Sequence, residues 1–163
     1  MKNNTSFAYF AGGCFWGVEH YFNRAKGVVE ALSGFMGGHT KNPTYEDVVY
    51  TDTGHLEVVQ VEYMPDEISY EELAKLFFEI HDPSQEGGQG PDIGERYISA
   101  IFVGNEEERD TVKKLITALE IKGHHIATKI LEKKEFYAAD NYHQNYYGKS
   151  GHIPYCHSHV KRF

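Results

Sequence analysis

The amino-acid sequence predicts an α+β fold: a mixed sheet with a ferredoxin-like split β-α-β core, helices packed on it, and a coil-rich C-terminal tail. Two observations favour this class. The first six long elements expected follow the order β-α-β-β-α-β, and an α-β pair and the tail come after them. Apolar residues alternate at period 2 in the expected strands and recur at helical spacing in the expected helices. Because 163 residues with no repeat or linker suit one hydrophobic core, we expect residues 1–163 to form a single domain.

Each expected element has a start or stop signal. Gly27 ends the first helix, and Ser69 with Glu72 forms a capping box before the second long helix. Pro83 follows the end of that helix, and Asn105 caps the third. In chain order we expect strands at 6–11, 28–35, 55–64, 97–103 and 126–131, helices at 15–26, 44–50, 69–81 and 105–122, and one short helix at 142–147 in the tail.

Composition excludes several classes of function. A net charge of -8 with a pI near 5.6 argues against sequence-independent nucleic-acid binding and against an anionic membrane surface as partner. Residues 1–11 are too short and too polar for a signal peptide or a membrane span, so we expect a cytoplasmic protein. The best histidine clusters, at 124–125 and 156–159, lack the spacing of a structural zinc site, so no metal is expected.

Cys14 lies in Gly-Gly-Cys-Phe-Trp-Gly, between the first expected strand and the first expected helix. The unpaired N–H groups of a helix start favour negative charge, and the thiolate is the reactive form of cysteine. Phe15 and Trp16 add two aromatic faces beside the sulfur. The motif therefore predicts a nucleophile with an apolar pocket. The second cysteine, Cys156, lies near the other end of the chain, and by count alone the two thiols are equally a transient redox pair or unrelated.

Glu57 is the candidate acid. Strand alternation places it on the same face as Val59, Val61 and Tyr63. If that face is the inner one, burial raises the pKa of the carboxyl, which can then act as a general acid. The alternative is an exposed glutamate at the frayed start of the strand. Asp92 lies in a glycine-rich loop, where an aspartate is usually a turn residue that bonds its own backbone.

Several segments together resemble peptide methionine sulfoxide reductase A. They occur in the same order as in that family and cover the chain from Phe7 to about Tyr147. The matching segments are 13–17, 44–48, 53–59, 81–83, 89–94 with Tyr97, and 140–147.

The resemblance implies a role for each matching residue. Cys14 would attack the sulfoxide sulfur, and Glu57 would protonate the sulfoxide oxygen. Tyr45 and Tyr97 would donate hydrogen bonds to that oxygen, and Asp92 would help to hold the site. The implied substrate is methionine sulfoxide of the S epimer, free or in oxidised proteins, and the implied protein is a monomer.

Phe15 and Trp16 would hold the methyl group of the substrate. Attack would leave Cys14 as a sulfenic acid, which a second thiol can convert to a disulfide. Cys156, in the tail 148–163, is the candidate resolving cysteine, since this chain has no third cysteine. Thioredoxin or another dithiol would then reduce the disulfide, and no cofactor is implied.

One position departs from the family pattern. The family often has Arg directly after the tyrosine matched by Tyr97, whereas this chain has Ile98 there and Arg96 before the tyrosine. Strand alternation would send Ile98 to the face opposite Tyr97.

Two other functions remain open on residue types alone. A cysteine hydrolase would need a histidine base, for which His81 with Asp82 or His143 with Asn141 could serve. A thiol redox-sensing binding module would need neither a histidine base nor a residue that orients it.

Overall fold

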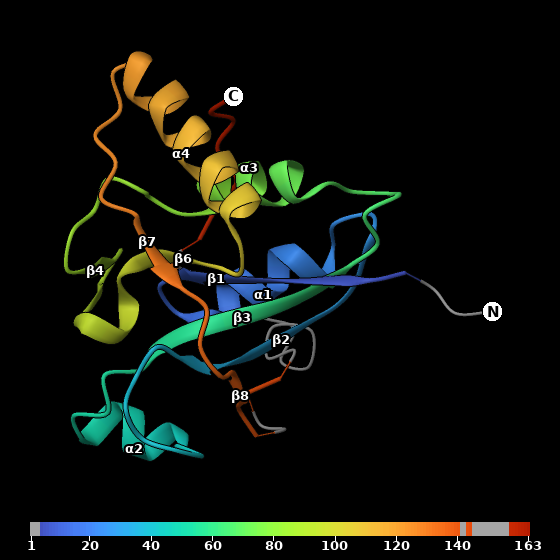
Figure 1. Cartoon of the computed structure of the whole chain (residues 1–163). Helices are drawn as coiled ribbons and strands as arrows, with labels where there is room; N and C mark the ends of the chain where they lie inside the picture. The colour runs from blue at the N-terminus through green and yellow to red at the C-terminus, as the bar shows by residue number, and fades with distance from the viewer. Residues whose placement is uncertain (1–3, 141–142, 145–156) are drawn as a thin grey trace.

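The structure, a computed structural model, describes residues 4–140, 143–144 and 157–163. Its main sheet has six strands in the order β7-β6-β1-β3-β2-β8 (Figure 1). The β6–β7 pair is parallel, and the β1–β3, β1–β6, β2–β3 and β2–β8 pairs are antiparallel. Strands β1 and β2 are therefore parallel with β3 between them, which is the split β-α-β arrangement. The predicted mixed α+β fold is confirmed.

The elements have the following bounds. The strands are β1 (Ser6–Gly12), β2 (Val28–Met36), β3 (Leu56–Tyr63), β4 (Gly88–Gln89), β5 (Asp92–Ile93), β6 (Ser99–Val103), β7 (Lys129–Glu132) and β8 (Tyr137–Ala138). The helices are α1 (Phe15–Asn23), α2 (Tyr45–Tyr50), α3 (Tyr70–Ile80), α4 (Glu106–Ile121) and the 3₁₀ turn η1 (Glu95–Tyr97). Strands β4 and β5 pair only with each other.

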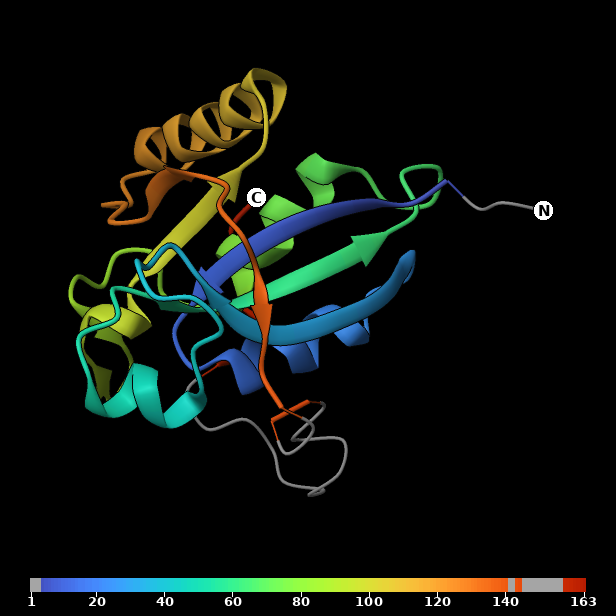
Figure 2. The same ribbon diagram turned by 60° about the horizontal axis from the view of Figure 1, so that its bottom comes forward.

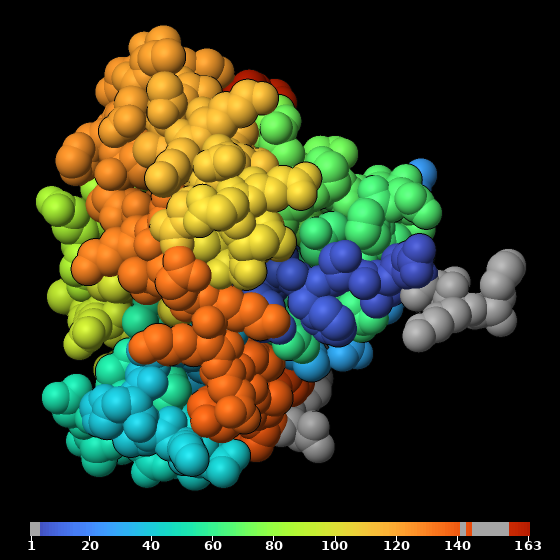
Figure 3. Space-filling view, in the orientation of Figure 1, coloured from blue at the N-terminus to red at the C-terminus, as the bar shows by residue number. Residues whose placement is uncertain are grey.

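The two faces of the main sheet are covered differently. Helices α1, α3 and α4 pack on one face and enclose the larger hydrophobic core (Figure 2). A smaller apolar cluster lies on the other face, and Leu131 of β7 and Phe136 pack against it. Phe136 belongs to the segment that leads from β7 to β8, drawn in orange across the front of the molecule in Figure 3.

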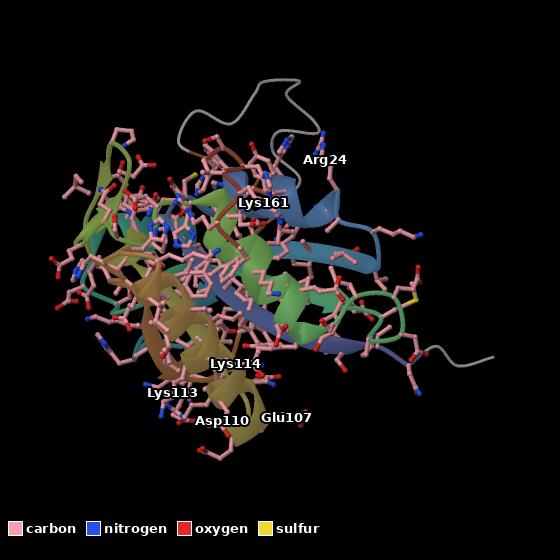
Figure 4. All side chains as sticks on the ribbon, turned by 90° about the horizontal axis from the view of Figure 1, so that it is seen from above. Arg24, Glu107, Asp110, Lys113, Lys114 and Lys161 are labelled. Atoms are coloured by element: carbon pink, nitrogen blue, oxygen red, sulfur yellow. The ribbon has the colours of Figure 1, made fainter. Side chains whose placement is uncertain are left out.

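Helix α4 shows how charge and packing separate on one helix. Its buried residues are Val112, Leu115 and Leu119, which recur at helical spacing as the sequence predicts. The charged side chains of Glu107, Asp110, Lys113 and Lys114 lie on the outer side of the helix (Figure 4).

Several predicted boundaries were wrong. Helix α1 ends at Asn23 instead of residue 26, because Arg24 and Ala25 bond to carbonyls three residues back and Gly27 has a φ of 94°. Residues 126–128, predicted as strand, precede β7, and the short strand β8 was not predicted. The predicted helix at 142–147 falls mostly outside the described residues.

The predicted strand at 97–103 begins two residues later, at Ser99. Residues 95–97 instead form the turn η1, closed by a bond from the Tyr97 N–H to the Gly94 carbonyl at 3.0 Å. Tyr97 and Ile98 are therefore not successive residues of a strand. Ile98 still packs in the smaller apolar cluster, on the side of the sheet away from the three helices.

Phe10 is at the centre of the larger core. Its ring stacks on Phe22 of α1 at 5.0 Å and on Phe77 of α3 at 5.1 Å between centroids. We expect Phe10→Ala to lower the free energy of unfolding by about 3–5 kcal/mol, because it leaves a cavity between two helices and the sheet. Phe7→Ala, on the same strand but 45% exposed, should cost less than about 1 kcal/mol. Urea unfolding of both variants checks this, and equal losses would contradict it.

Candidate active site

The topology brings four segments to one end of the sheet. Strands β3 and β6 both run antiparallel to β1, so the end of β1 lies beside the starts of β3 and β6. Cys14 follows β1, Glu57 is the second residue of β3, and Tyr97 precedes β6. Helix α2, which begins at Tyr45, comes after the end of β2, and Phe35 near that end pairs with Glu57. Residues far apart in sequence therefore converge.

Cys14 is the N-cap residue of α1 and is buried, with 7% of its surface exposed. Gly13 before it has a φ of 95°, a conformation that favours glycine, and a Cβ there would overlap the side chain of Gln89. The first turn of α1 contains no acidic residue, and the Cys14 side chain makes no capping bond. The positive end of the helix dipole is thus directed at the thiol and its surroundings.

Glu57 lies beside this helix start. Its side chain is 1% exposed, so the alternative of an exposed glutamate is wrong. Oε1 accepts a hydrogen bond from the Phe15 N–H at 3.2 Å, and Oε2 is 3.8 Å from Nε of Arg96. Val59 and Val61 on the same face belong to the larger core. The carboxyl therefore contacts the amide that directly follows the nucleophile candidate.

Tyr45 and Tyr97 are both partly buried, and the charge of Glu57 affects the pKa of each. Burial, followed by the charges of Glu57, Tyr97 and Cys14, raises the pKa of Tyr45 well above its usual range. Burial and then Glu57 also raise the pKa of Tyr97. Both phenols consequently stay protonated at neutral pH and can donate hydrogen bonds.

Several aromatic side chains pack together around the start of α1. Phe15 is fully buried, whereas Trp16 is partly exposed. The ring of His143 stacks on Tyr45 at 4.2 Å and on Trp16 at 5.7 Å, and lies 5.8 Å from Phe15. Burial lowers the pKa of His143, which favours the neutral ring. From residue types alone His143 is a candidate only for a hydrolase base, although it lies in the matching segment 140–147.

Asp92 lies on β5, opposite Gln89 of β4. It is close enough to raise the pKa of Tyr97, but its contribution is smaller than those of burial, of Glu57 and of Arg96. Arg96 is a residue of the site to which the sequence pattern assigns no role. Its Nη2 donates to the Tyr97 hydroxyl at 3.0 Å, in addition to its approach to Glu57. The only signal for it was its unusual place before Tyr97.

His81 does not support a cysteine hydrolase. The ring is buried, and this burial lowers the pKa of His81 to about 3. Nδ1 donates to the Phe77 carbonyl at 2.6 Å, and Nε2 accepts from the Ser99 hydroxyl at 2.7 Å. With both ring nitrogens engaged, His81 cannot act as the base for Cys14. Asn141, the partner considered for His143, lies outside the described residues.

Cys156 also lies outside the described residues, but the residue after it is described. His157 is buried, and its Nε2 donates to the Gly12 carbonyl at 2.7 Å. The ring occupies the space that a Cβ on Gly17 would fill. The chain beyond it is fixed on α3, where Glu79 accepts from the Arg162 N–H at 3.0 Å and pairs with His159 at 3.1 Å.

Within the parts of the chain that the structure describes, no three His, Cys, Asp or Glu side chains gather as a metal site would require. None of the described helices is long and apolar enough to cross a membrane.

Comparison with known proteins identifies the family of this chain. A family model described as peptide methionine sulfoxide reductase matches residues 6–163. The chain is 45% identical over 148 residues to the peptide methionine sulfoxide reductase MsrA of Ruthia magnifica subsp. Calyptogena magnifica. The match covers 91% of this chain and 89% of that relative.

Two solved structures of Mxr1 from Saccharomyces cerevisiae are similar as well. The reduced form has a TM-score of 0.89 at 33% identity, covering 99% of this chain and 96% of Mxr1. Mxr1 in complex with Trx2 has a TM-score of 0.64 at 28% identity, covering 100% and 96%. The chain belongs to the peptide methionine sulfoxide reductase family, and the family predicted from the sequence is confirmed.

The contact between Gly17 and His157 gives a test of this geometry. We expect Gly17→Ala to destabilise the protein by about 1–3 kcal/mol, because the new methyl group displaces the buried ring. In a His157→Ala background the same change should stabilise it by about 0.5–1 kcal/mol, because alanine is the better helix former. Urea unfolding of the four proteins measures both values. The same sign in both backgrounds would show that the ring does not pack there.

Proposed function

We propose that this site reduces methionine sulfoxide, of the S epimer and either free or in oxidised proteins, by attack of the Cys14 thiolate on the sulfoxide sulfur. The observation that carries the proposal is the placement of the buried Glu57 carboxyl on the Phe15 N–H, one residue after Cys14. A nucleophile and an acid are thereby held at one helix start, in surroundings that exclude bulk water.

The chemistry requires this pair. A sulfoxide oxygen is a poor leaving group until it is protonated, and Glu57 is the group that would supply the proton. In the reaction the substrate sulfur gains two electrons and becomes a thioether. The protonated oxygen leaves as water when the Cys14 sulfur bonds to the substrate sulfur. A water molecule then attacks the Cys14 sulfur, which loses two electrons and becomes a sulfenic acid as the thioether departs.

The tyrosines and the aromatic residues would orient the substrate. Tyr45 and Tyr97 remain protonated, so each can donate a hydrogen bond to the sulfoxide oxygen. Trp16 is the partly exposed aromatic residue beside Cys14 and would contact the methyl group, while the buried Phe15 supports it from the core. Asp92 would act at longer range, on the Tyr97 side of the site.

Cys156 would complete the cycle as the resolving cysteine. His157, the residue that follows Cys156 in the sequence, donates from Nε2 to the carbonyl of Gly12, two residues before Cys14. Condensation of its thiol with the Cys14 sulfenic acid would give a disulfide and one water molecule. Mxr1 has been solved in complex with Trx2, which supports a thioredoxin as the reductant of that disulfide. Such chemistry suits a reducing compartment such as the cytoplasm.

Replacing Glu57 by glutamine tests the acid. We expect Glu57→Gln to lower kcat by about 10²–10⁴-fold, because the amide cannot supply a proton. We also expect the activity of the parent protein to fall at alkaline pH, where a general acid is ionised, and this fall to be absent in Glu57→Gln. Glu62→Gln is the matched control on the same strand, where that side chain accepts from Thr5 on the other face. Methionine release from a sulfoxide substrate measures both. Activity of Glu57→Gln within a few-fold of the parent protein would refute the assigned role.

Replacing Cys156 by serine tests the recycling step. We expect Cys156→Ser to release one equivalent of methionine and then to stop when thioredoxin is the reductant, because Cys14 remains a sulfenic acid. Quantifying methionine in a single turnover, with mass analysis of a trapped sulfenic acid, checks this. Cys14→Ser should release none. Sustained turnover of Cys156→Ser with thioredoxin at the parent rate would remove Cys156 from the mechanism.

A further inference from the structure

Arg96 joins two groups of the site through one guanidinium. Nη2 donates to the Tyr97 hydroxyl at 3.0 Å, and Nε is 3.8 Å from Oε2 of Glu57. The guanidinium carbon also lies 4.4 Å from the centroid of the Tyr97 ring. The side chain is only 26% exposed, so solvent screens these interactions less than it would at the surface.

The backbone around Arg96 fixes it in this place. The turn η1 begins after Gly94, whose φ of 140° a residue with a side chain rarely adopts. The Gly94 N–H bonds to the Gly87 carbonyl at 2.8 Å, and β4 pairs with β5 between them. On the far side Ile98 is anchored in the smaller apolar cluster. Arg96 therefore projects from a short, closed turn.

The hydrogen bond to Tyr97 has a chemical consequence. A hydroxyl that accepts from a guanidinium keeps its own proton for another acceptor, and a charged donor makes that proton a stronger hydrogen-bond donor. Burial and Glu57 raise the pKa of Tyr97, while the hydrogen bond and charge of Arg96 act in the opposite direction. The charge of Arg96 has the same effect on Tyr45, whose pKa burial and Glu57 raise.

We propose that Arg96 is a positioning residue for sulfoxide reduction: it holds the Glu57 carboxyl and the Tyr97 hydroxyl on one cation and directs the Tyr97 proton to the sulfoxide oxygen. This inference rests on the function proposed above. A buried carboxyl with no cation beside it would hold its proton too tightly for transfer to a weakly basic oxygen, and Arg96 supplies that cation. Among the described residues, the other titratable groups of the site are Cys14 at the start of α1, Tyr45 on α2, Tyr97 on η1, Asp92 on β5, and His143.

The test is the pH profile of kcat/KM. We expect Arg96→Gln to lower kcat about 10-fold and to move the alkaline limb to higher pH by about one unit, because the carboxylate loses its stabilising cation. Arg96→Lys keeps the charge, so its limb should stay near that of the parent protein while kcat falls. Arg109→Gln is the charge-matched control, because Arg109 on α4 forms ion pairs with Glu106 and Glu132. This change should alter neither kcat nor the pH of the alkaline limb.

A second comparison separates positioning from general damage. If Arg96 acts through the Tyr97 hydroxyl, Arg96→Gln should reduce kcat less in a Tyr97→Phe background than in the parent protein. The proposal would be overturned if Arg96→Gln lowered kcat/KM equally at every pH without moving the alkaline limb. It would also be overturned if the effects of Arg96→Gln and Tyr97→Phe on kcat were fully additive. An alkaline limb that persists in Glu57→Gln would instead overturn the acid role itself, so the two failures are distinguishable.

Discussion

The hydrogen bond from the Phe15 N–H to the Glu57 carboxyl is the interaction on which the site depends. A helix start leaves several N–H groups without partners inside the helix, and α1 has neither a side-chain cap nor an acid in its first turn. A carboxylate from a different element satisfies one of these donors. In the β1–β3 register Phe10 faces Val59, so two residues further on Glu57 comes level with Gly12. Strand register therefore sets the separation between acid and nucleophile.

The same bond offsets part of the cost of burying a carboxyl. An ionised carboxylate that is removed from water without partners is strongly disfavoured. Glu57 has one oxygen on a helix-start amide and the other facing Arg96. The protonated acid and the carboxylate are therefore both possible in this place, which is what a group that must release a proton requires. A fully apolar environment would stabilise only the protonated form.

The parts of the site that follow from local pattern could be predicted from the sequence. Strand alternation placed Glu57 with Val59 and Val61, and the junction of strand and helix placed Cys14. Contacts that depend on turns or on distant segments could not. Arg96 reaches Glu57 because residues 95–97 form a 3₁₀ turn instead of the start of a strand. His143 joins Tyr45 and Trp16, and His157 fills the space above Gly17, across more than a hundred residues of sequence in the second case.

This division between strand and turn also explains how Arg96, the residue before Tyr97, can serve the site although it lies outside the main sheet. The acid is fixed by the sheet and the nucleophile by a helix start, and rigid elements hold reacting groups more precisely than loops do. The residues that modulate them lie on α2, on η1 and in the segment near His143. Ile98 is anchored in the smaller apolar cluster on one side of η1. The guanidinium of Arg96, on the other side of Tyr97, can therefore approach Glu57 without any movement of β6. Arg96 can thus place a positive charge beside Glu57 while β3 and the start of α1 fix Glu57 and Cys14.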